Sequence, residues 1–337
     1  MRVLFIGGTG NISTACSSLA LQKGIDLSLF VRGQTPRLFS GEARIISGDI
    51  RDSRQASAAL ENQEFDAVVD WVAYKPEHVD ADIALFRGRI RQYVLISSAS
   101  AYQKPPAHYL ITESTDLSNP FWQYARDKIA CEERLIRAFH EEGFPSTIVR
   151  PSLTYGDAWL PAAIGGHDYT IIDRMKKGKK IIVHGDGQSL WVMTHNSDFA
   201  RGLLGLLGNP TAIGERYHIT SDEVLTWDEI YRTMGQAAGV DPNLIHIPSD
   251  FIALFDPRIG AGLLGDKAYS VVFDNSKIKK AVPGFHATVS FADGMKRCLA
   301  RFESEERRRN ISEANNTIMD RIIARYQSAL PPDPASE

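Results

Sequence analysis

The chain has 337 residues, 43% of them hydrophobic, and a formal net charge of −3. This length provides for one large core or for a core with a smaller lobe, and the slightly acidic balance argues against a broad basic surface, so we expect no nucleic-acid partner. The three cysteines show neither metal-ligand spacing nor a disulfide framework, so we expect no metal site. Met1 leads directly into a strand-like run, and no apolar run approaches membrane-spanning length, so we expect a cytoplasmic protein without a membrane partner.

Strand-length apolar runs alternate with amphipathic segments through the first half of the chain. Strict alternation of this kind predicts an α/β fold, a doubly wound parallel sheet of the Rossmann type with helices on both faces. The predicted strands are residues 2–6, 27–31, 43–46, 67–71, 93–96 and 147–149, and the predicted helices are residues 12–23, 53–60, 77–86 and 122–142.

This regularity ends after Pro151, where glycine, proline and aromatic residues become frequent. We therefore expect a dinucleotide-binding domain over residues 1–152, a smaller C-terminal substrate lobe over residues 153–330 that is interleaved with the last sheet elements, and a flexible tail over residues 331–337. Within the second part, we predict strands 180–183 and 216–220, helices 197–207 and 227–238, and a loop over 253–269.

A glycine-rich turn links the first strand to the first helix, because residues 3–13 read VLFIGGTGNIS. Glycines permit a tight turn and a close approach of the backbone to a pyrophosphate, which a helix N-terminus attracts through free N–H groups and its dipole. The position of the loop after the first strand predicts a dinucleotide site that includes Gly7, Gly10, Asn11 and Ile12. Ser13 stands where a third glycine is usual, and it is small enough for close packing of helix and strand.

The residues after the second and third strands bear on the choice between NADP and NAD. An acidic residue at the end of the second strand would bond the ribose hydroxyls of NAD, whereas Arg32 favours the 2′-phosphate of NADP. We therefore expect NADP to be favoured over NAD; the alternative for Arg32 is a solvated strand-end residue. Asp49, followed by Ile50, is placed to reach the adenine, and capping of the next helix is an equally good interpretation of Asp49.

A tyrosine and a lysine share one face of the helix predicted over residues 122–142. Tyr124 and Lys128 are spaced i and i+4. A nearby ammonium favours the phenolate and would lower the tyrosine pKa, so that the pair could move a proton near neutral pH. Ser98 follows the fifth strand, at the sheet edge where ligands bind in such folds, and could hydrogen-bond a substrate oxygen.

With these residues in place, the chain resembles the short-chain dehydrogenase/reductase superfamily in its extended form, which includes nucleotide-sugar epimerases and dehydratases. The resemblance covers nearly the whole chain. It is carried by the glycine loop, Asp49, Ser97-Ser98-Ala99-Ser100-Ala101-Tyr102, the Tyr124/Lys128 pair, Arg150-Pro151, His184-Gly185-Asp186-Gly187 and Asp274-Asn275-Ser276-Lys277.

The resemblance implies a role for each matching residue. Tyr124 would be the general acid/base, Lys128 would lower its pKa and hold the nicotinamide ribose, and Ser98 would orient the reacting oxygen. Pro151 and Ser152 would flank the nicotinamide, and hydride would pass between the cofactor and a carbinol carbon.

The chain departs from nucleotide-sugar epimerases at two arginines that grip the substrate diphosphate in that family. One of them would stand four residues before the histidine of segment 191–195, where the chain has Trp191; the other would precede a Gly-Asp pair, where it has Leu264. Arg174 or Arg258 could substitute for them. The departures argue against copying the substrate from these relatives.

Four further residues are candidate substrate contacts, namely Ser100, Glu113, Trp191 and His195. Trp191 could stack on a sugar ring or pack within the lobe, and His195 could line the pocket or be a satisfied buried histidine. The segment around Ser100 carries no Asp-Glu pair, which argues against a 4,6-dehydratase.

These observations predict an enzyme that performs reversible hydride transfer on a polar, sugar-like small molecule, as an epimerase or as a dehydrogenase/reductase. Because members of the superfamily often dimerise through the helix that bears the Tyr/Lys pair, we expect a homodimer. The alternative is a non-catalytic or RNA-associated protein, since residues 182–200 also resemble the chloroplast stem-loop-binding proteins.

Overall fold

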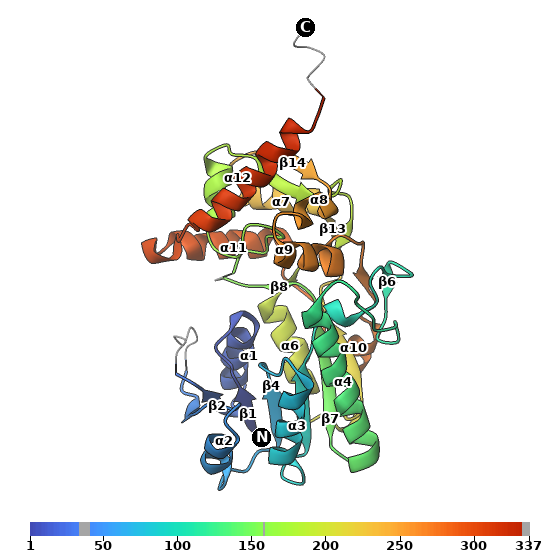
Figure 1. Ribbon diagram of the computed structural model, residues 1–337. Coiled ribbons are helices and arrows are strands. Elements are labelled where there is room, and N and C mark those ends of the chain that lie inside the picture. Colours follow the sequence, from blue (N-terminus) through green and yellow to red (C-terminus); the bar gives the residue numbers. More distant parts are fainter. Residues whose placement is uncertain (34–40, 158, 332–337) are drawn as a thin grey trace.

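The computed structural model describes residues 1–33, 41–157 and 159–331 (Figure 1). The predicted tail lies outside the described residues beyond Pro331. No helix in these ranges has the length and apolar character that a membrane crossing requires.

A parallel sheet forms the centre of the lower domain in Figure 1, and in the described part of the chain it has seven strands in the order β12-β7-β5-β4-β1-β2-β3. The strand order reverses between β1 and β4, which is the doubly wound arrangement predicted from the sequence, and the fold prediction is confirmed. The bounds are β1 (Arg2–Ile6), β2 (Asp26–Val31), β3 (Arg44–Ser47), β4 (Ala67–Asp70), β5 (Gln92–Ile96), β7 (Ser146–Pro151) and β12 (Arg216–Ile219).

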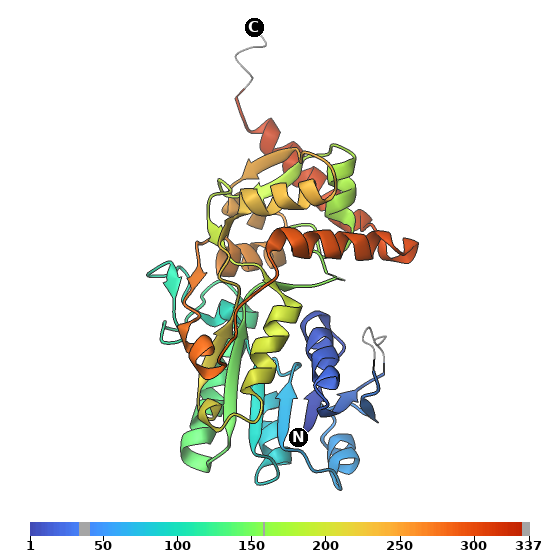
Figure 2. The ribbon, with the colours of Figure 1, turned by 180° about the vertical axis from the view of Figure 1, so that it is seen from behind.

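Helices cover both faces of this sheet. The central strands β4 and β5 are therefore buried on both sides. One apolar cluster joins the sheet to α1 (Asn11–Gln22), α6 (Asn196–Leu206) and α10 (Ser276–Ala281). A second cluster joins the other face to α2 (Ser53–Leu60), α3 (Pro76–Phe86) and α4 (Gln123–Glu142). The second group lies in front in Figure 1, and α1 and α6 lie in front in Figure 2.

Two elements from the second half of the chain complete the sheet domain. The strand predicted over residues 216–220 is β12, which pairs with β7 at the edge of the central sheet, and α6 packs beside α1. The chain therefore returns to the first domain after it has entered the lobe.

The lobe above the sheet has an apolar core of its own (Figure 1). Its helices are α5 (Thr170–Lys176), α7 (Trp227–Ala237), α8 (Ser249–Ala253), α9 (Pro257–Gly262), α11 (Phe291–Glu303) and α12 (Glu313–Ser328). Its strand pair is β9 (Ile181–His184) with β14 (Leu244–Ile247). Smaller pairs are β8 (Thr154–Tyr155) with β11 (Thr194–His195), β10 (Leu190–Trp191) with β13 (Leu225–Thr226), and β6 (Leu110–Ile111) with β15 (Val272–Phe273).

The segment 253–269, predicted to be a loop, instead contains α9 and a π-helical turn at Leu263–Lys267. The Asp256 carboxylate accepts a hydrogen bond from the backbone N–H of Arg258 at 2.7 Å and caps the helix, and Pro257 occupies its first turn. An Asp-Pro pair is a helix-start signal, and the interpretation of the glycines that follow as a loop overlooked it.

Candidate functional site

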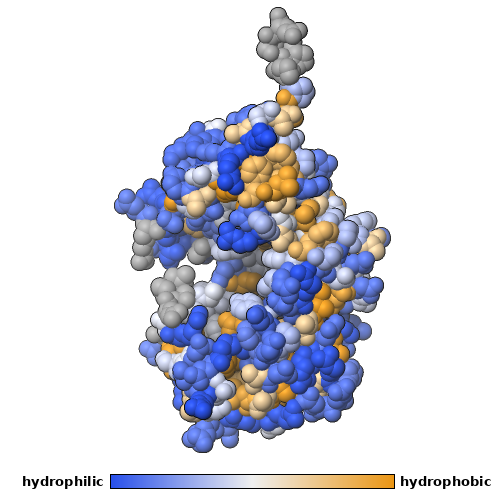
Figure 3. Space-filling model, viewed as in Figure 1, coloured by the Kyte–Doolittle hydropathy of each residue, from blue (hydrophilic) through white to orange (hydrophobic). Residues whose placement is uncertain are grey.

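A cavity of about 830 Å³ lies over the carboxyl ends of β1, β2, β4, β5 and β7, and Figure 3 shows the surface hollowed between the sheet domain and the lobe. This is the edge at which parallel sheets bind ligands. The predicted site residues that line it are Gly7, Gly10, Asn11, Ile12, Arg32, Asp49, Ile50, Ser98, Ser100, Tyr124, Lys128, Pro151, Ser152 and Trp191.

The glycine loop forms one end of the cavity. Gly7 and Gly8 have φ angles of 98° and 105°, which favour glycine, and a Cβ on Gly8 would lie 2.7 Å from Leu29 Cδ2. Gly10 is open toward the cavity, since among the described residues an added Cβ would meet only Ser13 Oγ. Ser13 Oγ also accepts the Gly10 N–H at 2.8 Å, so the serine that replaces the third glycine braces the turn.

The cavity walls fit a dinucleotide on two observations. The backbone at Gly10 and the start of α1 is bare enough for phosphates to approach closely. The indole Nε1 of Trp71, a cavity-lining donor, is buried without a hydrogen-bond partner among the described residues. Buried donors are normally satisfied, so a ligand atom is the natural acceptor.

At the end of the cavity that would hold the adenosine, Arg32 is exposed on the rim. Asp49 Oδ1 accepts the backbone N–H of Arg51 at 2.9 Å. The helix-capping alternative for Asp49 does not hold, because Asp52 caps α2 by accepting the N–H groups of Arg54 and Gln55. Asp49 therefore stays available at the cavity wall.

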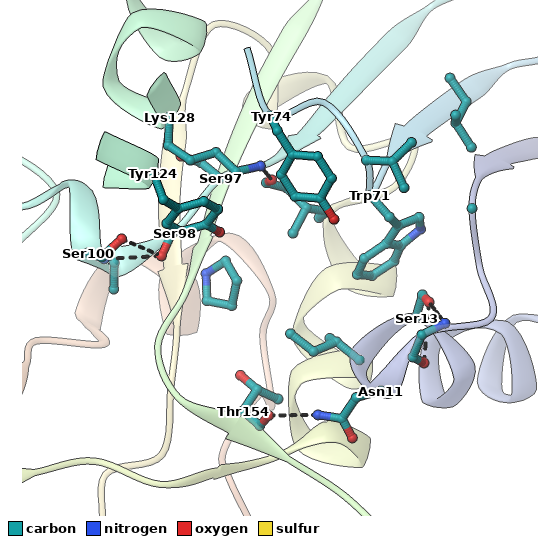
Figure 4. Close-up of a pocket in the computed structure, with 18 of the residues that line it drawn as sticks. Asn11, Ser13, Trp71, Tyr74, Ser97, Ser98, Ser100, Tyr124, Lys128 and Thr154 are labelled. Atoms are coloured by element: carbon teal, nitrogen blue, oxygen red, sulfur yellow. Dashed lines mark hydrogen bonds between the residues drawn. The ribbon is translucent and has the colours of Figure 1, made fainter. Parts of the chain in front are cut away.

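At the other end, polar side chains gather around Lys128 (Figure 4). Its ammonium donates hydrogen bonds to the carbonyl oxygens of Ala73 at 2.7 Å and Ile96 at 2.8 Å. The rings of Tyr74 and Tyr124 flank it, with centroids at 4.9 and 5.9 Å. Ser98 Oγ lies 2.9 Å from Ser100 Oγ and faces the Tyr124 side of this group.

Burial shifts the pKa values of Tyr124 and Lys128. It raises the pKa of Tyr124 to about 12, and a hydrogen bond with Ser98 opposes the rise. It lowers the pKa of Lys128 to about 8. The structure therefore does not show the predicted lowering of the Tyr124 pKa, because burial raises it and the Lys128 ammonium donates its hydrogen bonds to two backbone carbonyls.

A buried ion pair holds the strand ends beneath the site. The guanidinium of Arg150 and the carboxylate of Glu132 are 1% and 0% exposed and approach to 2.5 Å. Ser97 Oγ donates to the same carboxylate. The pair thus ties β5 and β7 to α4 next to Ser98, Pro151 and Lys128.

Two of the candidate substrate residues do not line the cavity. Glu113 turns toward β12, where its carboxylate accepts the N–H of His218 at 3.3 Å. His195 directly precedes α6, and its ring Nδ1 accepts the backbone N–H of Ser197, so it acts as the helix N-cap. Trp191 lines the cavity, and its ring centroid lies 5.5 Å from that of Trp227. It therefore both faces the cavity, as stacking on a sugar would need, and packs within the lobe.

The arginines suggested as replacements for the diphosphate-binding pair also lie elsewhere. Arg174 is buried against Asn316 and Asp320, and Arg258 is exposed beside Asp256. Over the described ranges, no cluster of three or more histidine, cysteine or acidic side chains could hold a metal.

Other cavity residues escaped the sequence analysis. Trp71 and Tyr74 directly follow β4, so the strand-end rule that selected Ser98 could have found them. Six further ones come from loops and turns after β7 or from the loops between β5 and α4 and carry no local signal; they are Lys104, Trp122, Trp159, His167, Asp266 and Lys267.

Known proteins resemble this chain in sequence and in fold. A family model described as "NAD dependent epimerase/dehydratase family" matches residues 3–220. The chloroplast stem-loop binding protein of 41 kDa b of Arabidopsis thaliana is 26% identical over 74% of this chain and 67% of that protein. The 2'-dehydrokanamycin reductase of Streptomyces kanamyceticus is 24% identical over 85% and 80%. The structure of UDP-glucose 4-epimerase from Thermotoga maritima aligns with a TM-score of 0.72 at 17% identity, over 90% of this chain and 99% of that one.

Proposed function

The chain belongs to the NAD dependent epimerase/dehydratase family, and from this premise we propose that it catalyses reversible hydride transfer at a carbinol carbon of a polar, sugar-like substrate. The predicted membership of the extended short-chain dehydrogenase/reductase superfamily is confirmed. The observation that carries the proposal is one continuous cavity that joins the glycine loop to Ser98, Tyr124 and Lys128.

In the proposed mechanism, the Ser98 hydroxyl holds the reacting oxygen and Tyr124 exchanges a proton with it. When the carbinol is oxidised, the Tyr124 phenolate takes the hydroxyl proton; in the reverse direction the phenol returns it. The bound dinucleotide would supply the hydride acceptor or donor and, when oxidised, a positive charge on the nicotinamide. Lys128 stabilises the phenolate if its ammonium leaves the Ala73 and Ile96 carbonyls and turns to the cavity.

For the cofactor, we propose a preference for NADP over NAD, supported by Arg32 on the rim and by the absence of an acidic residue at the end of β2. For the reaction, the relative named 2'-dehydrokanamycin reductase supports net reduction, whereas the family description supports epimerisation. Absorbance of reduced nicotinamide separates them, because an epimerase returns the cofactor unchanged at the end of each turnover.

The test of the catalytic assignment is Tyr124→Phe, assayed with the most active substrate from a screen of free and nucleotide-linked sugars. We expect turnover to fall about 10²–10⁴-fold, as for loss of a general acid/base, and the cofactor Kd to stay within about threefold. Tyr109→Phe is the matched control, since Tyr109 is 54% exposed and outside the cavity. Near-native turnover by Tyr124→Phe would disprove the assignment.

A second candidate function, RNA association, is supported by a neighbouring cavity between α1, α6 and α11, which shares Thr9, Gly10, Asn11 and Trp159 with the first one. Among the described residues, the arginines that line it are Arg201, Arg297, Arg301 and Arg308. Guanidinium groups bind phosphates well, and a relative is named for stem-loop binding. A salt-dependent shift of a stem-loop RNA that Arg297→Ala weakens would support this function; no shift at low salt would exclude it.

A further inference from the structure

Lys104 is a buried cation at the cavity wall. Its side chain is 3% exposed, and among the described residues nothing accepts a hydrogen bond from its ammonium or pairs with it within 4 Å. Burial lowers the pKa of Lys104, and the Lys267 charge lowers it further, while Asp266 opposes the shift. An uncompensated buried ammonium is strongly disfavoured, so this position calls for a negatively charged partner from outside the chain.

Lys267 approaches the same end of the cavity from the lobe. Its ammonium lies 5.6 Å from the Trp122 ring centroid and 3.7 Å from Asp266 Oδ2. Its backbone is fixed from β9, because its carbonyl oxygen lies 2.9 Å from His184 Nε2. The lysine is therefore held at the cavity wall.

Asn119 joins the two loops that carry these lysines. Its side-chain amide donates to the carbonyl oxygens of Ser100 at 2.9 Å and Gly265 at 2.7 Å. A Cβ on Gly265 would lie 2.8 Å from Trp122 Cβ, so the turn sits directly against the start of the helix that carries Tyr124. The lysine end is thus rigid and adjoins the proposed reacting end.

The charge and the shape of this end select a class of ligand. Two ammonium groups face one carboxylate, that of Asp266, and burial lowers the pKa of His167 to about 4, so the imidazole is neutral at pH 7. The His167 ring stacks on the Trp159 ring with a centroid separation of 3.5 Å, and Trp122 forms another part of the cavity wall. Aromatic faces accept a sugar ring, while the excess positive charge requires an acidic substituent.

We propose that Lys104 and Lys267 form an oxyanion subsite that binds a carboxylate or phosphate group attached to the sugar-like substrate close to its reacting carbon. This inference rests on the proposed function, because it takes the cavity to be the substrate site. The two lysines would act as point charges, without the bidentate geometry that an arginine offers a phosphate.

The test measures binding without turnover. The 337-residue chain, saturated with its preferred dinucleotide, is titrated by calorimetry with glucuronate, glucose 6-phosphate, glucose and glucosamine. We expect at least one anionic sugar to bind tenfold or more tightly than glucose, and glucosamine to bind most weakly. The glucuronate and phosphate arms tell which oxyanion the subsite prefers. Equal binding of charged and neutral sugars, or no binding of either anionic sugar, would overturn the proposal.

Substitutions of the two lysines test whether they cause the preference for anionic sugars. Lys104→Gln should reduce the preference for the anionic sugar to within threefold of glucose while the dinucleotide Kd stays unchanged, and Lys267→Gln should do the same. Lys296→Gln, at a side chain that is 71% exposed, is the matched control. If both cavity variants keep the preference, the subsite is refuted. A lysine-dependent preference without any hydride transfer would refute only the proposed reaction.

Discussion

The buried Arg150–Glu132 pair gives a stability prediction whose size follows from its geometry. Glu132→Gln keeps the shape of the side chain and removes its charge. The guanidinium approaches both carboxylate oxygens at 2.5–3.1 Å, with Ser97 as a further donor, and neither member of the pair is more than 1% exposed. The variant therefore leaves a buried guanidinium without a counter-charge.

Breaking a buried ion pair on one side costs about 3–5 kcal/mol, and we expect Glu132→Gln to lower the free energy of unfolding by that amount. This is a large part of the ~5–15 kcal/mol by which folded domains are usually stable. Because the pair anchors the strand ends beside Ser98 and Pro151, the variant should also weaken dinucleotide binding.

Urea unfolding followed by circular dichroism measures the effect. Glu133→Gln is the matched control, since Glu133 is the exposed neighbour on the same helix. Glu132→Gln combined with Arg150→Met removes both charges and should recover at least half of the loss. The reasoning fails if Glu132→Gln costs less than about 1 kcal/mol, or if the double variant is no more stable than the single one.

Three further predictions concern the cofactor, pH and assembly. Arg32→Ala should weaken NADP binding tenfold or more and NAD binding by less than threefold, measured by fluorescence titration; equal effects would refute the 2′-phosphate argument. Burial lowers the pKa of Lys128 from 10.5 to about 8. Between these pH values the unfolded chain binds one more proton at this lysine than the folded chain does. The contribution of Lys128 to the free energy of unfolding therefore rises with pH over that window, by about 3 kcal/mol in total. The unfolding free energy of the native protein minus that of Lys128→Met, compared at pH 7.5 and 9.5 without cofactor, should increase; a flat difference contradicts the burial of a charged lysine. Light scattering should give the mass of a dimer, and a monomer at working concentration would exclude the expected assembly.

Local sequence determined the features that depend on neighbouring residues. The glycine turn follows from residues that require positive φ and bare backbone, and Tyr124 and Lys128 share a face because a helix repeats every 3.6 residues. Ser98 lies at the cavity because strand ends in a parallel sheet meet at one edge. These rules need only the order of residues along the chain.

Tertiary packing decided the rest. Glu113 lies ten residues before Gln123, the first residue of the helix that bears Tyr124, yet its side chain contacts β12, so proximity along the chain was misleading. Lys104 and Lys267 are far apart in sequence, yet the fold brings both to one cavity, and Asn119 bonds the segments that carry them. The proton affinity of Tyr124 also depends on burial by the surrounding fold, a long-range property that no residue spacing encodes.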